Sequence, residues 1–136
     1  NRAYASLEAA LARFRLAPPQ PCENHYIVDY IARHSLKQIE NEAGQIGWNW
    51  KFDPYMLVNF DFGRVTADVI GKITCQMAMM RGADSALVDD RIWDFMRSQR
   101  PHMDMISIPD AQHHVMLDQP LAFINALQTQ LTAWSH

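Results

Sequence analysis

The chain has 136 residues, of which 49% are hydrophobic and 20% charged, the composition of an ordinary globular protein. The formal net charge is −3 and the basic residues are scattered, so the sequence lacks the positive patch that binding to nucleic acid or an anionic membrane surface requires. No apolar stretch approaches the ~20 residues of a membrane span. We therefore expect a protein that neither binds nucleic acid nor spans a membrane.

The cysteines indicate the compartment of the protein, and the first residue indicates whether the chain is complete. Cys22 and Cys75 are isolated, without C-x-x-C spacing, so we expect two buried free thiols and a reducing, cytoplasmic compartment. The chain begins at Asn1 without a methionine or a signal peptide, which suggests a processed or partial chain.

Residues 1–62 are expected to be mainly helical, with one hairpin-like aromatic segment. Ser6 is a favourable N-cap, and the proline-rich stretch 17–21 ends the helix that follows it. A second helix is predicted over about 23–35. Residues 48–52 alternate large apolar with polar side chains, which predicts a short strand ended by Asp53-Pro54.

Residues 63–136 are expected to alternate helix and strand. A short helix is marked by Val65, Val69 and Ile73. The compact apolar runs at 75–80 and 103–108 predict buried strands on either side of a helix at about 89–99.

Two helical faces in this second part are predicted to be buried. The first belongs to the helix between the strands, and the second to a last helix that begins near Pro120. The predicted inward residues are Val88, Ile92, Phe95 and Met96 in the first helix, and Ile124, Leu127, Leu131 and Trp134 in the second.

A strand, a helix and a second strand in this order predict a βαβ unit and therefore an α/β fold with a parallel sheet. Two strands cannot form a stable parallel sheet with both faces covered. We therefore expect the rest of the sheet to come from a missing N-terminal half or from a partner chain.

The most informative stretch follows the second predicted strand. His113 lies on the loop that leaves this strand, at the end where α/β enzymes bind their ligands. Four residues separate His113 from Asp118, which stands just before the last helix. We expect Asp118 to cap that helix, because the N-terminus of a helix stabilises a carboxylate.

The strand, the loop histidine, the acid-x-Pro sequence and the amphipathic helix together resemble the end of the α/β-hydrolase fold. The resemblance implies that His113 is the general base and acid of a nucleophile–His–acid triad. The family usually has glycine before this histidine, where this sequence has Gln112. This departure leaves His114 as a second candidate.

The resemblance also implies a triad acid shortly after the preceding strand. The expected acid positions hold Ser85 and Ala86, and Asp84 comes one or two residues early. Two alternatives are open: Asp84 reaches Nδ1 of His113 and holds the imidazole in the correct tautomer, or the acid follows another strand outside this chain. Asp84 is otherwise a cap of the following turn.

Residues 1–62 resemble the cap of monoacyl-ester, epoxide and C–C bond hydrolases, which roofs the substrate pocket. His34, Trp50 and Phe52 are accordingly candidate pocket residues. The competing interpretation is that they form the core of the cap, and it is the commoner role for aromatic residues at such spacing.

The nucleophile signature G-x-S-x-G is absent from the sequence. The resemblance therefore implies a hydrolase whose N-terminal half supplies the nucleophile, with a small or medium hydrophobic ester as substrate. Epoxide, haloalkane and C–C bond hydrolases use the same frame, and a non-catalytic binding or scaffold protein is the alternative. We expect no cofactor and no metal site, because adjacent histidines point apart and no third ligand lies at a recognised spacing.

Overall fold

The computed structural model describes residues 3–40, 43–53, 55, 56, 58 and 67–135. The chain divides into two compact units, Asn1–Asp61 and Phe62–His136, close to the division expected at residue 62. The predicted strand end at Pro54 and the predicted helix residue Val65 lie outside the described residues. That the first unit is a cap stays a prediction.

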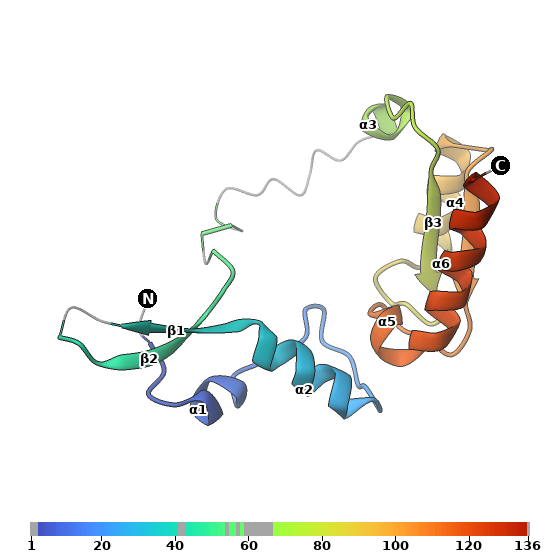
Figure 1. Ribbon diagram of the computed structural model, residues 1–136. Helices are drawn as coiled ribbons and strands as arrows, with labels where there is room; N and C mark the ends of the chain where they lie inside the picture. Colours follow the sequence, from blue (N-terminus) through green and yellow to red (C-terminus); the bar gives the residue numbers. More distant parts are fainter. Residues whose placement is uncertain (1–2, 41–42, 54, 57, 59–66, 136) are drawn as a thin grey trace. The chain divides into compact units, whose positions relative to one another are not determined.

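The first unit contains two helices and a hairpin (Figure 1). Its elements are α1 (Leu7–Leu11), α2 (His25–His34), β1 (Leu36–Glu40) and β2 (Ile46–Trp50). The Ser6 hydroxyl accepts a hydrogen bond from the backbone N–H of Ala9 at 3.1 Å, which confirms the predicted N-cap. The aromatic strand begins two residues earlier than predicted and pairs antiparallel with β1, so that Leu36 lies opposite Trp50.

The second unit alternates helix and strand as expected (Figure 1). Its elements are α3 (Ala67–Gly71), β3 (Ala78–Gly82), α4 (Asp90–Gln99), β4 (Asp104–Ile108), α5 (Val115–Asp118) and α6 (Pro120–Trp134). Strands β3 and β4 pair in parallel, from Ala78 opposite Asp104 to Gly82 opposite Ile108, which confirms the predicted βαβ unit. The sequence did not predict α5.

The buried face of α4 differs from the prediction. Ile92 and Phe95, both expected to be buried, are 38% and 46% exposed, whereas Trp93 is 5% exposed. The guanidinium of Arg81 in β3 lies 4.6 Å from the centre of the Trp93 ring. This contact turns the Trp93 face toward the sheet, because an arginine over an indole is favourable when both are shielded from water.

The buried face of α6 is also not the one predicted. Three of the four residues expected to form its core stripe are exposed, Ile124 by 46%, Leu127 by 38% and Leu131 by 50%, whereas the fourth, Trp134, is half-buried. The packed face contains small residues and one aromatic residue, which lie against a core formed by β4 and the following loop. These packed residues are Ala122, Phe123 and Ala126, and the core residues are Ile108, Ala111 and Val115.

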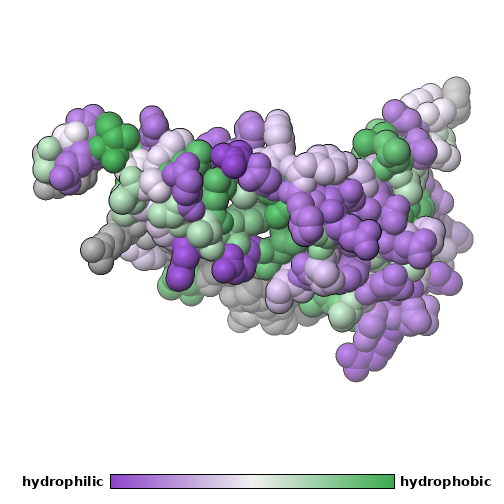
Figure 2. All heavy atoms as spheres, turned by 90° about the horizontal axis from the view of Figure 1, so that it is seen from below, coloured by the Kyte–Doolittle hydropathy of each residue, from purple (hydrophilic) through white to green (hydrophobic). Residues whose placement is uncertain are grey.

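Small alanine side chains let α6 approach β4 closely, and close approach decides which apolar face is buried. In Figure 2, hydrophobic side chains reach the surface among hydrophilic ones. No helix among the described residues is long and apolar enough to cross a bilayer.

The cysteines are less buried than predicted. Neither cysteine forms a disulfide in the described part of the chain, but Cys22 is only half-buried and Cys75 is exposed. Cys75 is exposed because strand β3 begins at Ala78, which leaves the cysteine on the segment before the strand.

The end of β3 is joined to the loop that follows β4. The backbone N–H of Ala83 donates to the carbonyl of Ile108 at 2.8 Å, and that of Asp84 donates to the carbonyl of Ala111 at 2.9 Å. A Cβ atom on Gly82 would collide with the carbonyl oxygens of Ala111 and Gln112. The two segments therefore approach so closely that the last residue of β3 has to be glycine.

We expect the substitution Gly82→Ala to lower the free energy of unfolding by about 3 kcal/mol or more, because backbone atoms cannot move aside as a flexible side chain can. The measurement is urea unfolding followed by circular dichroism. Gly71→Ala is the matched control, since a Cβ at Gly71 meets no atom within 4 Å. Equal stability of the two variants would show that the strand end and the loop are not in close contact.

Candidate functional site

The loop that carries His113 is held by the backbone and by two side chains. Asp110 adopts a left-handed conformation with φ of 53°, and Ala111 is completely buried. The Gln119 side-chain amide donates to the carbonyl of Asp110 at 3.2 Å. The backbone N–H of Gln112 donates to the Asp118 carboxylate at 2.7 Å. The residue next to His113 is thus anchored directly.

The role of Asp118 differs from the predicted one. It lies at the end of α5, and the N-cap of α6 is Gln119, which makes no capping hydrogen bond through its side chain. The short helix α5 turns the Asp118 carboxylate back toward Gln112. Asp118 therefore anchors the histidine loop through Gln112, and it is not the N-cap residue of the last helix.

His113 is half-buried and faces the turn after β3. Its Nδ1 lies 3.4 Å from Oγ of Ser85, a side chain that is only 5% exposed. The same Oγ accepts a hydrogen bond from the backbone N–H of Val88 at 3.1 Å. The His114 ring lies edge-on to His113, with 5.2 Å between the ring centres. The structure thus brings His113, His114 and Ser85 together.

Asp84 is not in the predicted position. Its backbone N–H is bonded to Ala111 and its side chain is exposed. Within the described part of the chain, its carboxylate makes no hydrogen bond to His113, and Ser85 faces Nδ1 instead. The expected Asp84–His113 contact is therefore not formed. The alternative, an acid supplied from outside this chain, stays a prediction.

Arg81 supports this turn, and the sequence analysis did not identify it. Its guanidinium donates to the carbonyl of Val88 at 3.0 Å and forms an ion pair with the Asp90 carboxylate. The Arg81 side chain is only 10% exposed. Because the N–H of Val88 holds the Ser85 hydroxyl, Arg81 fixes the segment that carries Ser85.

The candidate pocket residues Trp50 and Phe52 belong to an aromatic cluster within the first unit. The half-buried Trp50 ring lies 6.2 Å from Tyr4, 6.0 Å from Phe14 and 6.2 Å from Phe52 between ring centres. Phe52 itself is 55% exposed. These contacts are those of a packing core, and the predicted contact with substrate stays a prediction.

His34, the third candidate pocket residue, lies on the exposed surface of α2. Its ring stacks on Tyr30 with 4.0 Å between ring centres, and its Nδ1 lies 2.8 Å from the Tyr30 carbonyl oxygen. Since a carbonyl can only accept, Nδ1 of His34 carries the hydrogen. This bond fixes the orientation of the ring and leaves Nε2 as its second polar atom.

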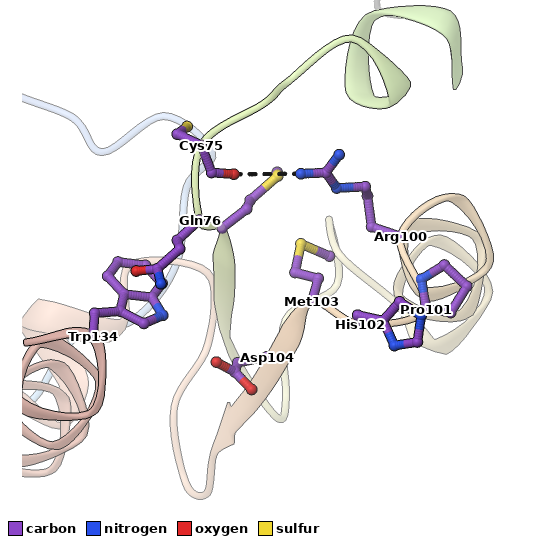
Figure 3. A pocket seen from close by; sticks show the side chains of 9 residues that line it. Cys75, Gln76, Arg100, Pro101, His102, Met103, Asp104 and Trp134 are labelled. Atoms are coloured by element: carbon purple, nitrogen blue, oxygen red, sulfur yellow. Dashed lines mark hydrogen bonds between the residues drawn. The ribbon is translucent and has the colours of Figure 1, made fainter. Parts of the chain in front are cut away.

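A cavity of about 460 Å³ lies at the amino ends of β3 and β4 (Figure 3). Arg100 crosses one side of it and donates to the carbonyls of Ile73 at 2.7 Å and Cys75 at 3.4 Å. His113 follows the carboxyl end of β4, so this cavity is at the opposite end of the strands. We place the candidate active site at His113, because parallel sheets bind their substrates at the carboxyl ends of the strands.

We expect Asp118→Ala to lower the free energy of unfolding by roughly 1.5–3 kcal/mol, the range for a hydrogen bond to a charged group. The backbone N–H of Gln112 should then exchange its hydrogen with solvent faster, which hydrogen–deuterium exchange measures. Asp94→Ala is the control, because Asp94 is an exposed carboxylate on α4. Unchanged exchange at Gln112 would contradict the anchoring role of Asp118.

We expect Trp50→Ala to lower the free energy of unfolding by about 2–3 kcal/mol, because it removes the ring around which the aromatic cluster is built. Phe52→Ala should cost less than about 1 kcal/mol, since the ring is half in water. Urea unfolding of both variants measures the difference. A Trp50 variant as stable as the original protein would favour the pocket interpretation over the core interpretation.

Comparison with known proteins shows a fold and not a close relative. No protein-family profile and no curated protein matches the sequence. Among solved structures, the chain is similar to E-2-(acetamidomethylene)succinate hydrolase, with a TM-score of 0.66 and 17% identity over 94% of this chain and 46% of that one. It is also similar to an esterase from Mycobacterium tuberculosis, with a TM-score of 0.70 and 20% identity over 97% of this chain and 44% of that one.

These solved structures are α/β-hydrolases, so the resemblance seen in the sequence is confirmed at the level of fold. The chain spans less than half the length of the proteins that it matches. The chain therefore has the fold of one part of an α/β-hydrolase.

Proposed function

We propose that the complete protein to which this chain belongs is a hydrolase of the α/β-hydrolase superfamily, with His113 as its general base. The observation that carries the proposal is the position of His113 on an anchored loop at the carboxyl ends of two parallel strands. The names of the similar solved structures, a hydrolase and an esterase, support the class of reaction.

In the proposed mechanism, Nε2 of His113 accepts the proton of a nucleophile, most simply a serine hydroxyl, as that oxygen attacks the ester carbonyl. His113 then returns the proton to the leaving alcohol and activates the water that hydrolyses the acyl-enzyme. Nδ1 faces Ser85, which leaves Nε2 as the nitrogen for these transfers. The nucleophile and its oxyanion donors would come from the part of the fold outside this chain.

The rest of the sheet is the proposed partner of the second unit. Among the described residues, β3 and β4 pair only with each other, which leaves the second edge of β3 without a neighbouring strand. The chain matches 43–46% of the similar structures, so an N-terminal half of about equal size would complete the sheet. An open parallel edge of this kind is costly unless it is paired or covered.

The proposed substrate is a small or medium hydrophobic ester. The first unit would roof the pocket as a cap, with Trp50, Phe52 and His34 as the candidate contacts. Aromatic side chains suit this role because they bury a large apolar area on an acyl or alkyl group. Two cysteines without a disulfide between them are compatible with the reducing, cytoplasmic location that we propose.

A non-catalytic binding or scaffold protein on the same frame is the second candidate. It is favoured by the absence of a carboxylate at Nδ1 of His113 among the described residues. Epoxide, haloalkane and C–C bond hydrolases are further alternatives, since they differ from esterases in parts of the site outside this chain. The nucleophile distinguishes all of these functions.

The nucleophile is tested by incubating the complete protein with a fluorophosphonate and measuring intact masses under denaturing conditions. An adduct on the part that accompanies this chain would support a serine hydrolase. A protein without an adduct would favour a carboxylate nucleophile or the binding protein. Folding of this chain alone, as a stable monomer without a partner half, would contradict the proposal that it is part of a larger sheet.

We expect His113→Ala to lower kcat for p-nitrophenyl butyrate by about 10²–10⁴-fold, the usual contribution of a general base. His102→Ala is the matched control, because His102 lines the cavity at the opposite end of the strands. If His114→Ala removes activity while His113→Ala does not, the second histidine is the base. Full activity in both variants would contradict the assignment of either one.

A further inference from the structure

We propose that Ser85 is a positioning residue for His113, in the place where α/β-hydrolases usually have the triad acid. This inference rests on the proposed function and concerns the same site. It departs from the usual arrangement, because the partner of the base would be a neutral hydroxyl on the turn after β3.

The geometry that supports this role is local and buried. Ser85 is 5% exposed, and its Oγ lies 3.4 Å from Nδ1 of His113. The turn is fixed at both ends: Ser85 N–H donates to the carbonyl of Gly82 at 3.2 Å, and Ser85 Oγ accepts from Val88 N–H at 3.1 Å. The Ser85 hydroxyl is therefore held in one place against the imidazole.

The Ser85 hydroxyl has the hydrogen-bonding capacity to accept from Val88 and from His113 at the same time. A serine oxygen has two lone pairs and one hydrogen. The Val88 N–H takes one lone pair, and the second can accept the hydrogen of Nδ1. With the hydrogen on Nδ1, Nε2 is free to accept the proton of a nucleophile, as a general base requires.

A hydroxyl stabilises the charged form of a histidine base less than a carboxylate does. It orients the ring and selects the tautomer, but it adds no negative charge to stabilise the imidazolium that forms during the reaction. Ser85 would therefore give His113 the correct geometry with a smaller electrostatic contribution. Asp84, one residue earlier, has an exposed side chain and does not take this role in the described structure.

The first test is the tautomer of His113 in the unaltered protein, measured from nitrogen-15 chemical shifts of the imidazole at a pH where the ring is neutral. The expected result is a hydrogen on Nδ1. A dominant tautomer with the hydrogen on Nε2 would overturn the proposal, because Ser85 would then be a donor to Nδ1 and the ring could not act as the base.

The second test compares variants in the complete protein. Ser85→Ala should shift the tautomer equilibrium and lower kcat about tenfold or more with little change in KM, whereas Ser85→Thr should keep both because it retains the hydroxyl. Ser98→Ala, on the exposed surface of α4, controls for the loss of a hydroxyl elsewhere. Asp84→Asn should leave the His113 tautomer unchanged.

The outcomes separate this inference from the proposed function. If His113→Ala lowers kcat but Ser85→Ala changes neither the tautomer nor kcat, Ser85 has no positioning role and the hydrolase proposal stands. If Asp84→Asn shifts the tautomer and Ser85→Ala does not, Asp84 is the partner of the base. Should both His113→Ala and His114→Ala retain full activity, the proposed function fails whatever the tautomer of the imidazole.

Discussion

The candidate site depends on the close approach between the end of β3 and the loop after β4. Gly82 lies against the carbonyl groups of Ala111 and Gln112, and two backbone hydrogen bonds join the segments. Because parallel strands end at the same edge of a sheet, this junction holds the turn with Ser85 against the loop with His113. Backbone contacts thus bring the two segments together, and the side chains of Asp118 and Ser85 then contact the histidine loop and the imidazole.

Much of the fold could be predicted because its signals are local and repeated. The apolar runs, the helix between them and the histidine loop indicated a βαβ unit, and the parallel pairing of 78–82 with 104–108 confirms it. The strand bounds moved by a few residues, since an apolar run shows that a strand exists but not where its hydrogen bonds begin. The resemblance to α/β-hydrolases came from the same stretch and is confirmed as a fold.

The details of the site could not be predicted in the same way, because backbone geometry decides them. A one-residue difference separates Asp84 from Ser85, and the bond between Asp84 N–H and the Ala111 carbonyl determines which side chain faces His113. Asp118 resembles a helix cap in sequence, but the unpredicted α5 turns it toward Gln112. In α6, which is apolar on several sides, periodicity cannot tell which face packs, and the small residues Ala122 and Ala126 decide it.

The contacts that hold the histidine loop differ from the surfaces that the proposed remainder of the sheet would cover. His113 is held by contacts within the second unit: Asp118 to the histidine loop, and Arg81 and Val88 to the turn of Ser85. The exposed leucine face of α6 and the open edge of β3 are different, because they gain stability only when further strands and helices cover them. In the proposed enzyme, completing the sheet would therefore add the nucleophile to a base that is already oriented. Catalysis would then depend on how accurately the added strands pair with β3, since that pairing sets the distance between the nucleophile and Nε2 of His113.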